Sequence, residues 1–354
     1  MESSWKAGIQ LWSGFEPLDG GMAAAAGYRM PLQNLPFRLD VPGAAKAIAP
    51  FIRRTPVMRN PELEEPGGGA VFLKLENLQV TGSFKVRGAA NRILLLTETE
   101  RKRGVIACSS GNHGRAVAYM AGQLGISAVI CVPNWVDPVK LSGMNRAGAR
   151  VILAGDSYDE AEARAMALAE EEGRAFVQPF DDPWVAAGQG TLGLELLEQV
   201  PGLDTLFIPL SGGGLAGGVA YAVKELHPEI RIVAVSAANA RVMYESLRVG
   251  KPVSMEEEET LAEALSGGIG LTNRYSLPLV RELVDEHILV GEDEIRAAML
   301  YAAGSLNLLL EGGGAVALAA LLGRRGGQHR ETGTEAVGVI LSGGNVSLPR
   351  LQRL

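Results

Sequence analysis

The chain has 354 residues, with 33 Lys and Arg against 40 Asp and Glu, so its formal charge at pH 7 is −7. This acidic balance argues against a protein that binds polyanions, and we expect no nucleic-acid and no membrane partner. Hydrophobic residues make up 47% of the chain, which excludes a disordered protein. Glycine is over-represented, with 45 residues, but lacks the three-residue period of collagen.

The start of the chain gives no sign of export. Residues 1–39 lack the basic and apolar segments of a secretory signal, and no run of 18 apolar residues predicts a membrane span. We interpret residues 1–39 as an N-terminal extension. Cys108 and Cys131 lie in apolar, strand-like runs, so we expect core residues in a reducing, cytoplasmic compartment.

From about residue 40, short strands rich in Val and Ile alternate with helical segments, which predicts a parallel α/β fold. Glycine clusters follow several strands, at the sheet edge where ligands bind in such folds. The predicted strands are residues 70–75, 105–108, 128–132, 150–153, 205–208, 230–235 and 337–341. The predicted helices include residues 115–124, 158–172 and 217–226.

The first candidate motif spans residues 75–89, where a strand ends, a polar turn follows and a helix begins. Ser83 or Thr81 is expected to cap that helix. Lys85 falls in the first turn, where the helix dipole and burial both lower the pKa of an amine. Such a lysine suits imine chemistry, although this segment alone fits a surface lysine better.

The second motif is Ser109-Ser110-Gly111-Asn112-His113-Gly114, between a predicted strand and a predicted helix. Small residues there expose backbone N–H groups at a helix start, which favours an anion site. The serines and glycines also fit an ordinary capped turn. Asn112 and His113 add donors that a turn alone does not need.

The third motif places Gly212, Gly213 and Gly214 between the strand at 205–208 and a helix. Backbone amides of such a loop can surround a phosphate. Gly212, Gly214 and Gly217 also match a dinucleotide-binding spacing. That alternative requires an acidic residue at the end of the next strand, and residues 233–238 contain none.

The fourth motif is Ser342-Gly343-Gly344-Asn345, after the last predicted strand. In this order the four motifs resemble the serine/threonine dehydratase family of pyridoxal 5′-phosphate (PLP) enzymes, over residues 39–348. The resemblance implies fold type II, with two open, twisted, mostly parallel sheets flanked by helices and the cofactor between domains. It implies a large domain of residues 40–103 and 183–354, a small mobile domain of residues 104–182, and a homodimer or homotetramer.

The resemblance also implies the roles of site residues. Lys85 forms an imine with PLP and acts as the base at the substrate α carbon, and Phe84 packs beside the ring. Asn112 binds the 3′ oxygen, Ser342 faces the pyridine nitrogen, and Glu311 lies near the cofactor. The implied phosphate ligands are Ser211, Gly212, Gly213, Gly214 and Leu215. The implied ligands of the substrate carboxylate are Ser110, Gly111, Asn112 and His113.

The implied reaction is β-elimination, in which a β-hydroxy amino acid yields a 2-oxo acid and ammonia. The neutral hydroxyl of Ser342 favours elimination over transamination. The chain ends soon after Gly344, so we expect no regulatory C-terminal domain. Ser110 resembles the serine of serine racemases, which keeps racemization open. Where those racemases hold a metal ion through acids, this chain has Ser236 and Val242, so we expect no metal.

Three segments, residues 111–118, 180–191 and 265–275, look like the hydroxyectoine-utilisation dehydratases, which implies a hydroxylated diaminobutyrate as substrate. Arg274 or Glu311 would then recognise the side chain of this substrate. A β-replacement synthase of the same fold is disfavoured by Lys85-Val86-Arg87 and Asn112-His113. A non-catalytic or dinucleotide-binding protein is disfavoured by Lys85 and by the missing ribose acid.

Overall fold

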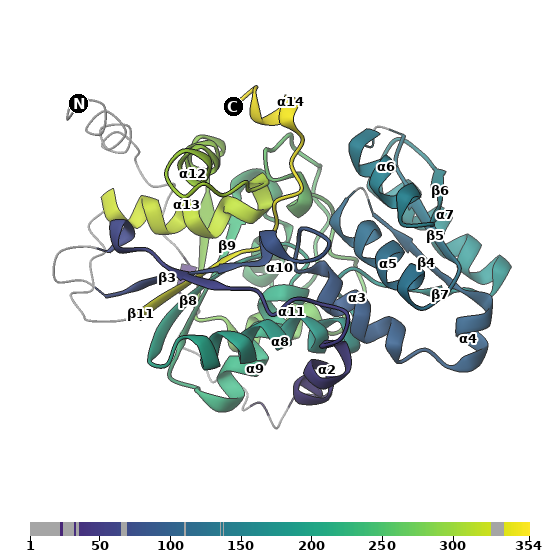
Figure 1. Ribbon diagram of the computed structural model, residues 1–354, viewed down its shortest axis with the longest axis horizontal. Helices are drawn as coiled ribbons and strands as arrows, with labels where there is room; N and C mark the ends of the chain where they lie inside the picture. Colours follow the sequence, from purple (N-terminus) through teal and green to yellow (C-terminus); the bar gives the residue numbers. More distant parts are fainter. Residues whose placement is uncertain are drawn as a thin grey trace.

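The described part of the chain builds two β-sheets (Figure 1). The computed structural model describes residues 22–23, 32, 35–64, 69–109, 111–134, 136, 138–326 and 336–354. Strands from both ends of the chain form a seven-stranded sheet, and the segment between them forms a four-stranded sheet. This is an α/β architecture with two separate sheets flanked by helices, as the sequence predicted.

The seven-stranded sheet has the order β1-β10-β9-β8-β11-β3-β2. Its inner strands pair in parallel, and the two edge strands pair antiparallel to their neighbours. Inner strands are almost continuously buried, as a sheet covered on both faces requires. The bounds are β1 Met22–Ala23, β2 Val57–Arg59, β3 Val71–Leu75, β8 Leu203–Pro209, β9 Arg231–Ala237, β10 Glu286–Val290 and β11 Ala336–Leu341.

The four-stranded sheet is parallel throughout, in the order β6-β5-β4-β7. Cys108 on β4 is paired in register with Cys131 on β5, and both are buried and free, which confirms them as core residues. The sheet lies within residues 104–182. The bounds are β4 Val105–Cys108, β5 Ala128–Val132, β6 Arg150–Leu153 and β7 Ala175–Phe176.

Helices cover both faces of each sheet (Figure 1). On the large sheet, α12 and α13 pack on one face, and α8, α9 and α11 form the layer on the other. Helix α3 packs against both α8 and α5 and so joins the two units. The bounds are α2 Val41–Ile48, α3 Lys85–Leu94, α4 Glu98–Arg103, α5 Asn112–Gln123, α6 Pro138–Arg146, α7 Tyr158–Glu172, α8 Pro183–Gln199, α9 Gly214–Leu226, α10 Val242–Val249, α11 Ser276–Leu283, α12 Glu292–Gly304, α13 Gly312–Gly326 and α14 Leu348–Leu351.

All seven predicted strands are present, and α7 has the predicted bounds. Helices α5 and α9 begin three residues earlier than the predicted 115 and 217, at Asn112 and Gly214, so each starts inside its glycine loop. Strands β2 and β7 escaped prediction because they have only three and two residues. Strand β10 was missed because Glu286 and His287 interrupt its apolar run.

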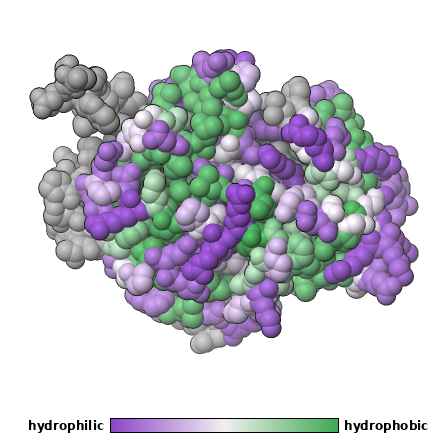
Figure 2. Space-filling model, viewed as in Figure 1, coloured by the Kyte–Doolittle hydropathy of each residue, from purple (hydrophilic) through white to green (hydrophobic). Residues whose placement is uncertain are grey.

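The surface is mixed, and in Figure 2 hydrophobic residues gather on the part of the face that carries α12 and α13. Leu300, Leu309 and Leu348, from the chain around these helices, have exposed fractions of 50%, 56% and 66%. Exposed apolar side chains that cluster are typical of association surfaces. Within the described residues, no helix is both long and apolar enough to cross a membrane.

Candidate active site

Three of the four candidate motifs follow strands at one edge of the large sheet, and the second motif follows β4 of the small one. Strands β8, β11 and β3 are parallel neighbours, so their carboxyl ends lie side by side and bring the loops that follow them together. The Phe84 N–H donates to the Ser342 carbonyl at 3.1 Å, and Ser83 forms an isolated β-bridge with Gly343. The first and fourth motifs are therefore hydrogen-bonded to one another.

Lys85 begins α3, and its amine is turned into the molecule. Lys85 Nζ donates to the Pro179 carbonyl at 2.9 Å and lies 5.3 Å from the centre of the Phe84 ring. Burial lowers the pKa of Lys85 from 10.5 to about 8, while the negative charge of Glu311 acts in the opposite direction. The lowered pKa agrees with the sequence-based expectation, and a fraction of this amine is neutral near pH 8.

The predicted cap of α3 is wrong. The N-cap residue is Phe84, whose side chain has no oxygen to accept a hydrogen bond, and its N–H donates to the Ser342 carbonyl of the neighbouring loop. Thr81 Oγ1 instead donates to the Ser83 carbonyl at 3.4 Å. Ser83 Oγ is buried and has no hydrogen-bond partner among the described residues. A buried unsatisfied hydroxyl beside Lys85 is a polar group that a bound ligand can satisfy.

Asn112 forms the first turn of α5, and both ends of its side-chain amide are engaged. Its Nδ2 donates to Glu311 Oε1, and its Oδ1 accepts from Asn345 Nδ2 at 2.7 Å. Glu311 is buried directly before α13, and burial raises its pKa. Asn112 therefore links α5, which packs on the small sheet, to two loops of the large one.

The His113 ring is hydrogen-bonded to the backbone of Val177. It is buried, and its Nε2 lies 2.8 Å from the Val177 carbonyl, which can only accept, so this nitrogen carries the proton. Burial and the charge of Lys85 lower the pKa of His113 to about 3. The ring is thus neutral, and only the backbone N–H of His113 remains for a role in carboxylate binding.

The tri-glycine loop runs directly into α9. Gly213 has a φ of +86°, a left-handed conformation that favours glycine. A β carbon on Gly214 would lie 2.8 Å from the Phe180 α carbon, and one on Gly212 would collide with the Phe180 ring. The first backbone N–H groups of α9 have no partner within the helix, which makes them available to an anion.

Two hydroxyls of the candidate set already have partners. Ser211 Oγ donates to the Leu265 carbonyl at 2.8 Å. Ser342 is buried, and its Oγ lies 3.3 Å from the Gly313 carbonyl. Leu215 is buried in the first turn of α9. These positions hold the loops together as well as lining the site.

The sequence did not indicate a site role for the segment of residues 177–182, which contacts the first three motifs. The Pro179 carbonyl accepts a hydrogen bond from the Lys85 amine, and Phe180 packs on the tri-glycine loop. Asp181 accepts three backbone hydrogen bonds, at 2.8–2.9 Å, from Arg274, Tyr275 and Ser276. The one available signal was Asp182 before a proline, which indicates the N-cap that it forms on α8.

Together these groups fit PLP. The amine of Lys85 suits its aldehyde, the amides at the start of α9 suit its phosphate, and the Asn112 Nδ2 group suits its ring oxygen. Gly111 is half-buried, and a β carbon on it would lie 3.6 Å from the Lys140 side chain. Ser110 lies outside the described residues.

The remaining predicted positions are less central. Arg274 is exposed, and its backbone N–H is bound by Asp181. Ser236 is buried and donates to the Leu210 carbonyl at 2.9 Å. In the part of the chain that the structure describes, no group of three or more His, Cys, Asp or Glu side chains could hold a metal ion.

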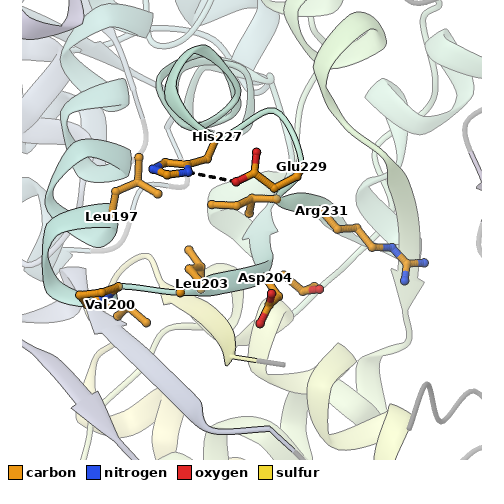
Figure 3. Close-up of a pocket in the computed structure, with 11 residues that line it drawn as sticks. Leu197, Val200, Leu203, Asp204, His227, Glu229 and Arg231 are labelled. Atoms are coloured by element: carbon orange, nitrogen blue, oxygen red, sulfur yellow. Dashed lines mark hydrogen bonds and ion pairs between the residues drawn. The ribbon is translucent and has the colours of Figure 1, made fainter. Parts of the chain in front are cut away.

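A cavity of about 610 Å³ lies at the opposite edge of the large sheet, where β8 and β9 begin (Figure 3). Its polar side chains are paired: His227 Nδ1 lies 3.0 Å from Glu229, and Arg231 forms an ion pair with Glu286 at 2.6 Å. Asp204 accepts from the Ala336 N–H at 2.6 Å. The cavity is therefore separate from the candidate active site.

Comparisons with known proteins agree with this geometry. Residues 48–343 match the family described as pyridoxal-phosphate dependent enzyme. An L-threonine ammonia-lyase of Thermotoga maritima is 39% identical over 89% of this chain and 77% of its own length. The catabolic L-threonine dehydratase of Escherichia coli is 37% identical over 91% of this chain and 97% of its own.

A solved structure, that of maize serine racemase, is also similar. It superposes with a TM-score of 0.83 at 37% identity, covering 88% of this chain and 94% of that chain. Dehydratases and a racemase are therefore both among the relatives of this chain.

Proposed function

Because the chain belongs to the family of pyridoxal-phosphate dependent enzymes, in its serine/threonine dehydratase branch, we propose that it converts a β-hydroxy amino acid to a 2-oxo acid and ammonia. It is a PLP-dependent lyase of threonine- or serine-like substrates. One observation supports the assignment of the site most directly. The Pro179 carbonyl accepts a hydrogen bond from the Lys85 amine, and the next residue, Phe180, packs on the tri-glycine loop. A covalent anchor and a phosphate loop thus lie on either side of one short segment.

Lys85 binds the cofactor and then moves the proton. Its Nζ, with a pKa of about 8, can hold a proton or release it near neutral pH, which is what a general base at the α carbon needs. When bound, PLP supplies an electron-withdrawing ring that stabilises negative charge on that carbon. Because Lys85 is fixed at the first turn of α3, its amine stays within reach of the substrate.

The loops orient the ligands. We propose that the amides of Gly212, Gly213, Gly214 and Leu215, with Ser211, hold the phosphate. The backbone of Gly111, Asn112 and His113, with Ser110, binds the substrate carboxylate. Phe84 packs beside the ring, Asn112 and Glu311 lie at its 3′ oxygen, and Ser342 presents a neutral hydroxyl to its nitrogen. The residue types support these roles.

We propose that residues 104–182 form the small domain, which closes over the substrate. Ion pairs and hydrogen bonds already join the two units: Lys140 of α6 lies 3.0 Å from Glu263, and Arg115 of α5 lies 2.7 Å from Asn345. The exposed leucines near α12 and α13 support the predicted homodimer or homotetramer, whose mass light scattering would measure.

We propose that the specific substrate is a hydroxylated diaminobutyrate derived from hydroxyectoine, because three sequence segments resemble the hydroxyectoine-utilisation dehydratases. Racemization is the second candidate activity, favoured by Ser110 and by the similarity to maize serine racemase. Both are tested with one panel of substrates. We expect 2-oxo acid from serine, threonine, 3-hydroxyaspartate or hydroxy-diaminobutyrate, and chiral chromatography of the remaining amino acid reports racemization.

The cofactor assignment has a direct test. Purified protein supplied with PLP is expected to be yellow, and borohydride followed by peptide mapping is expected to label Lys85. Lys85→Ala should abolish the label, whereas Lys102→Ala, at an exposed lysine of α4, should retain it. A protein that takes up no PLP contradicts the proposal. Cysteine formation from sulfide and an activated serine, without ammonia release from the panel, would indicate β-replacement instead.

A further inference from the structure

Asn345 lies where three loops of the site meet. Its Nδ2 donates to the Thr81 carbonyl at 2.9 Å and to Asn112 Oδ1 at 2.7 Å. Its Oδ1 accepts from Arg115 Nη1 at 2.7 Å. Asn345 thus contacts the loop that precedes Lys85 and two residues of α5.

The chemistry of the outer partners fixes the direction of the Asn345 amide. A guanidinium only donates and a backbone carbonyl only accepts, so Asn345 must turn its oxygen to Arg115 and its nitrogen to Thr81. The same nitrogen then faces Asn112, which must present its oxygen in return. The Asn112 nitrogen is consequently directed to Glu311. A reversed Asn112 would bring two NH₂ groups together.

The space for this arrangement is provided by Gly82. Gly82 has a φ of +75°, and a β carbon there would collide with the Asn345 amide. The Gly344 N–H donates to the Gly82 carbonyl at 2.9 Å, which holds the two loops at a fixed separation. The Asn345 side chain is therefore enclosed by a built turn.

We propose that Asn345 and Arg115 are positioning residues, which fix the side-chain amide of Asn112 so that its NH₂ group faces the cofactor site. The inference rests on the proposed function, in which Asn112 binds the 3′ oxygen of PLP. A donor at that oxygen stabilises its anionic form and holds its pKa down. An acceptor in the same place would raise it.

The test replaces each partner and follows the bound cofactor by absorbance. Asn345→Asp keeps the size of the side chain and its contact with Arg115 but removes the donor to Asn112. We expect the pH midpoint of the visible absorbance of bound PLP to rise by about one unit, and PLP affinity in equilibrium dialysis to fall about tenfold. A merely structural role would lower the melting temperature and leave the midpoint unchanged.

Comparing Arg115→Gln with Arg115→Met distinguishes the effect of the hydrogen bond to Asn345 from the effect of the Arg115 charge. Both remove the cation, but only glutamine can donate to Asn345 Oδ1. We expect Arg115→Met to shift the midpoint in the same direction as Asn345→Asp and Arg115→Gln to restore most of it. Arg146→Met is the control for a lost charge nearby, because Arg146 is exposed on α6, and it should leave the midpoint unchanged.

Failure of this inference is distinct from failure of the proposed function. If wild-type protein binds PLP at Lys85 and Asn345→Asp has the wild-type midpoint, or Arg115→Gln behaves as Arg115→Met, the positioning role is wrong. If wild-type protein binds no PLP, the proposed function is wrong. In that case the Asn112 orientation is read from its side-chain amide NMR signals in the apoprotein, which Asn345→Asp should shift; unchanged signals overturn the inference.

Discussion

Arg87 and Glu76 form an ion pair with no solvent exposure of either side chain, and Arg87 Nη2 lies 2.7 Å from Glu76 Oε1. A second bond, from Arg87 Nε to Glu76 Oε2 at 2.8 Å, makes the pair bidentate. The other side of the guanidinium binds Glu195 of α8, which also accepts from Lys74 at 2.6 Å. Two buried cations therefore balance two carboxylates, and α3 is joined to β3 and α8 two residues after Lys85.

We expect Arg87→Met to lower the free energy of unfolding by about 3–5 kcal/mol, because two carboxylates would lose their main partner inside the protein. Urea unfolding measures this. The control is Lys102→Met, which breaks the ion pair between Lys102 and Glu98. These side chains are 74% and 82% exposed, so their ion pair contributes at most about 1 kcal/mol to stability. Equal losses in the two variants would contradict the structural role of the buried pair.

Lys85 should control the pH dependence of cofactor capture. Only its neutral amine attacks an aldehyde, and the pKa of about 8 means that the neutral fraction rises with pH and levels off above that value. Stopped-flow absorbance of apoprotein with PLP should give a midpoint near 8, whereas a free lysine derivative keeps rising towards its ordinary 10.5. A protein midpoint near 10.5 would show that Lys85 is not desolvated.

The same shift affects the stability of the apoprotein. Between pH 8 and 10.5 the unfolded chain holds a proton on Lys85 that the folded chain has released, so the folded state gains stability as pH rises through this window. Lys85→Met removes this contribution. The difference in unfolding free energy between wild type and Lys85→Met should therefore change with pH in this window and stay constant below it.

Much of the fold followed from local sequence. The apolar runs of β4, β5 and β11 are dictated by burial on both faces, and the glycine loops are placed by the strands that precede them. The order of the loops around Lys85 indicated the chemistry. The strands and loops depend on neighbours in sequence, which is why one sequence sufficed to predict them, whereas the chemistry came from the resemblance of the four motifs to a known family.

The contacts that complete the site could not be predicted in this way. Thr81 and Asn345, or Asp181 and Tyr275, lie far apart in the chain, and no periodicity links them. The expected cap by Ser83 or Thr81 was wrong: the N-cap residue is Phe84, and the loop before α3 is hydrogen-bonded to Ser342, which is distant in the chain. The ring of His113 turned to Val177 because a buried imidazole needs a partner, and only the packed structure supplies one.

Gly213 and Gly250 offer a matched comparison, with φ angles of +86° and +82°. Alanine at either position has similar left-handed strain, about 1–2 kcal/mol. A β carbon on Gly213 would also lie 2.8 Å from Met243 Cε and 3.1 Å from Ser276 Cβ, whereas nothing lies within 4 Å of one on Gly250. We expect only Gly213→Ala to weaken PLP binding, about tenfold or more by equilibrium dialysis. Equal PLP affinity in the two variants would show that this loop does not bind the phosphate.

Asp181 should hold the start of α11 in place. Its two oxygens accept three N–H groups, at residues 274–276, from a segment that lies 93–95 positions away in the chain. Without the carboxylate these donors lose their acceptors, so we expect Asp181→Ala to lower stability by about 1–2 kcal/mol and to accelerate hydrogen exchange locally. Mass spectrometry of peptides covering residues 274–276 measures the second effect.

Asp182→Ala is the matched control, because Asp182 also caps a helix but binds the N–H groups of Trp184 and Val185 at the start of α8. It should accelerate exchange at residues 184–185 and leave residues 274–276 protected. Asp181→Asn keeps one acceptor oxygen, so its effect should fall between wild type and Asp181→Ala. Wild-type exchange at residues 274–276 in Asp181→Ala would mean that the loop before α11 is held by its own packing. In that case the segment of residues 177–182 does not hold the loop before α11 in place.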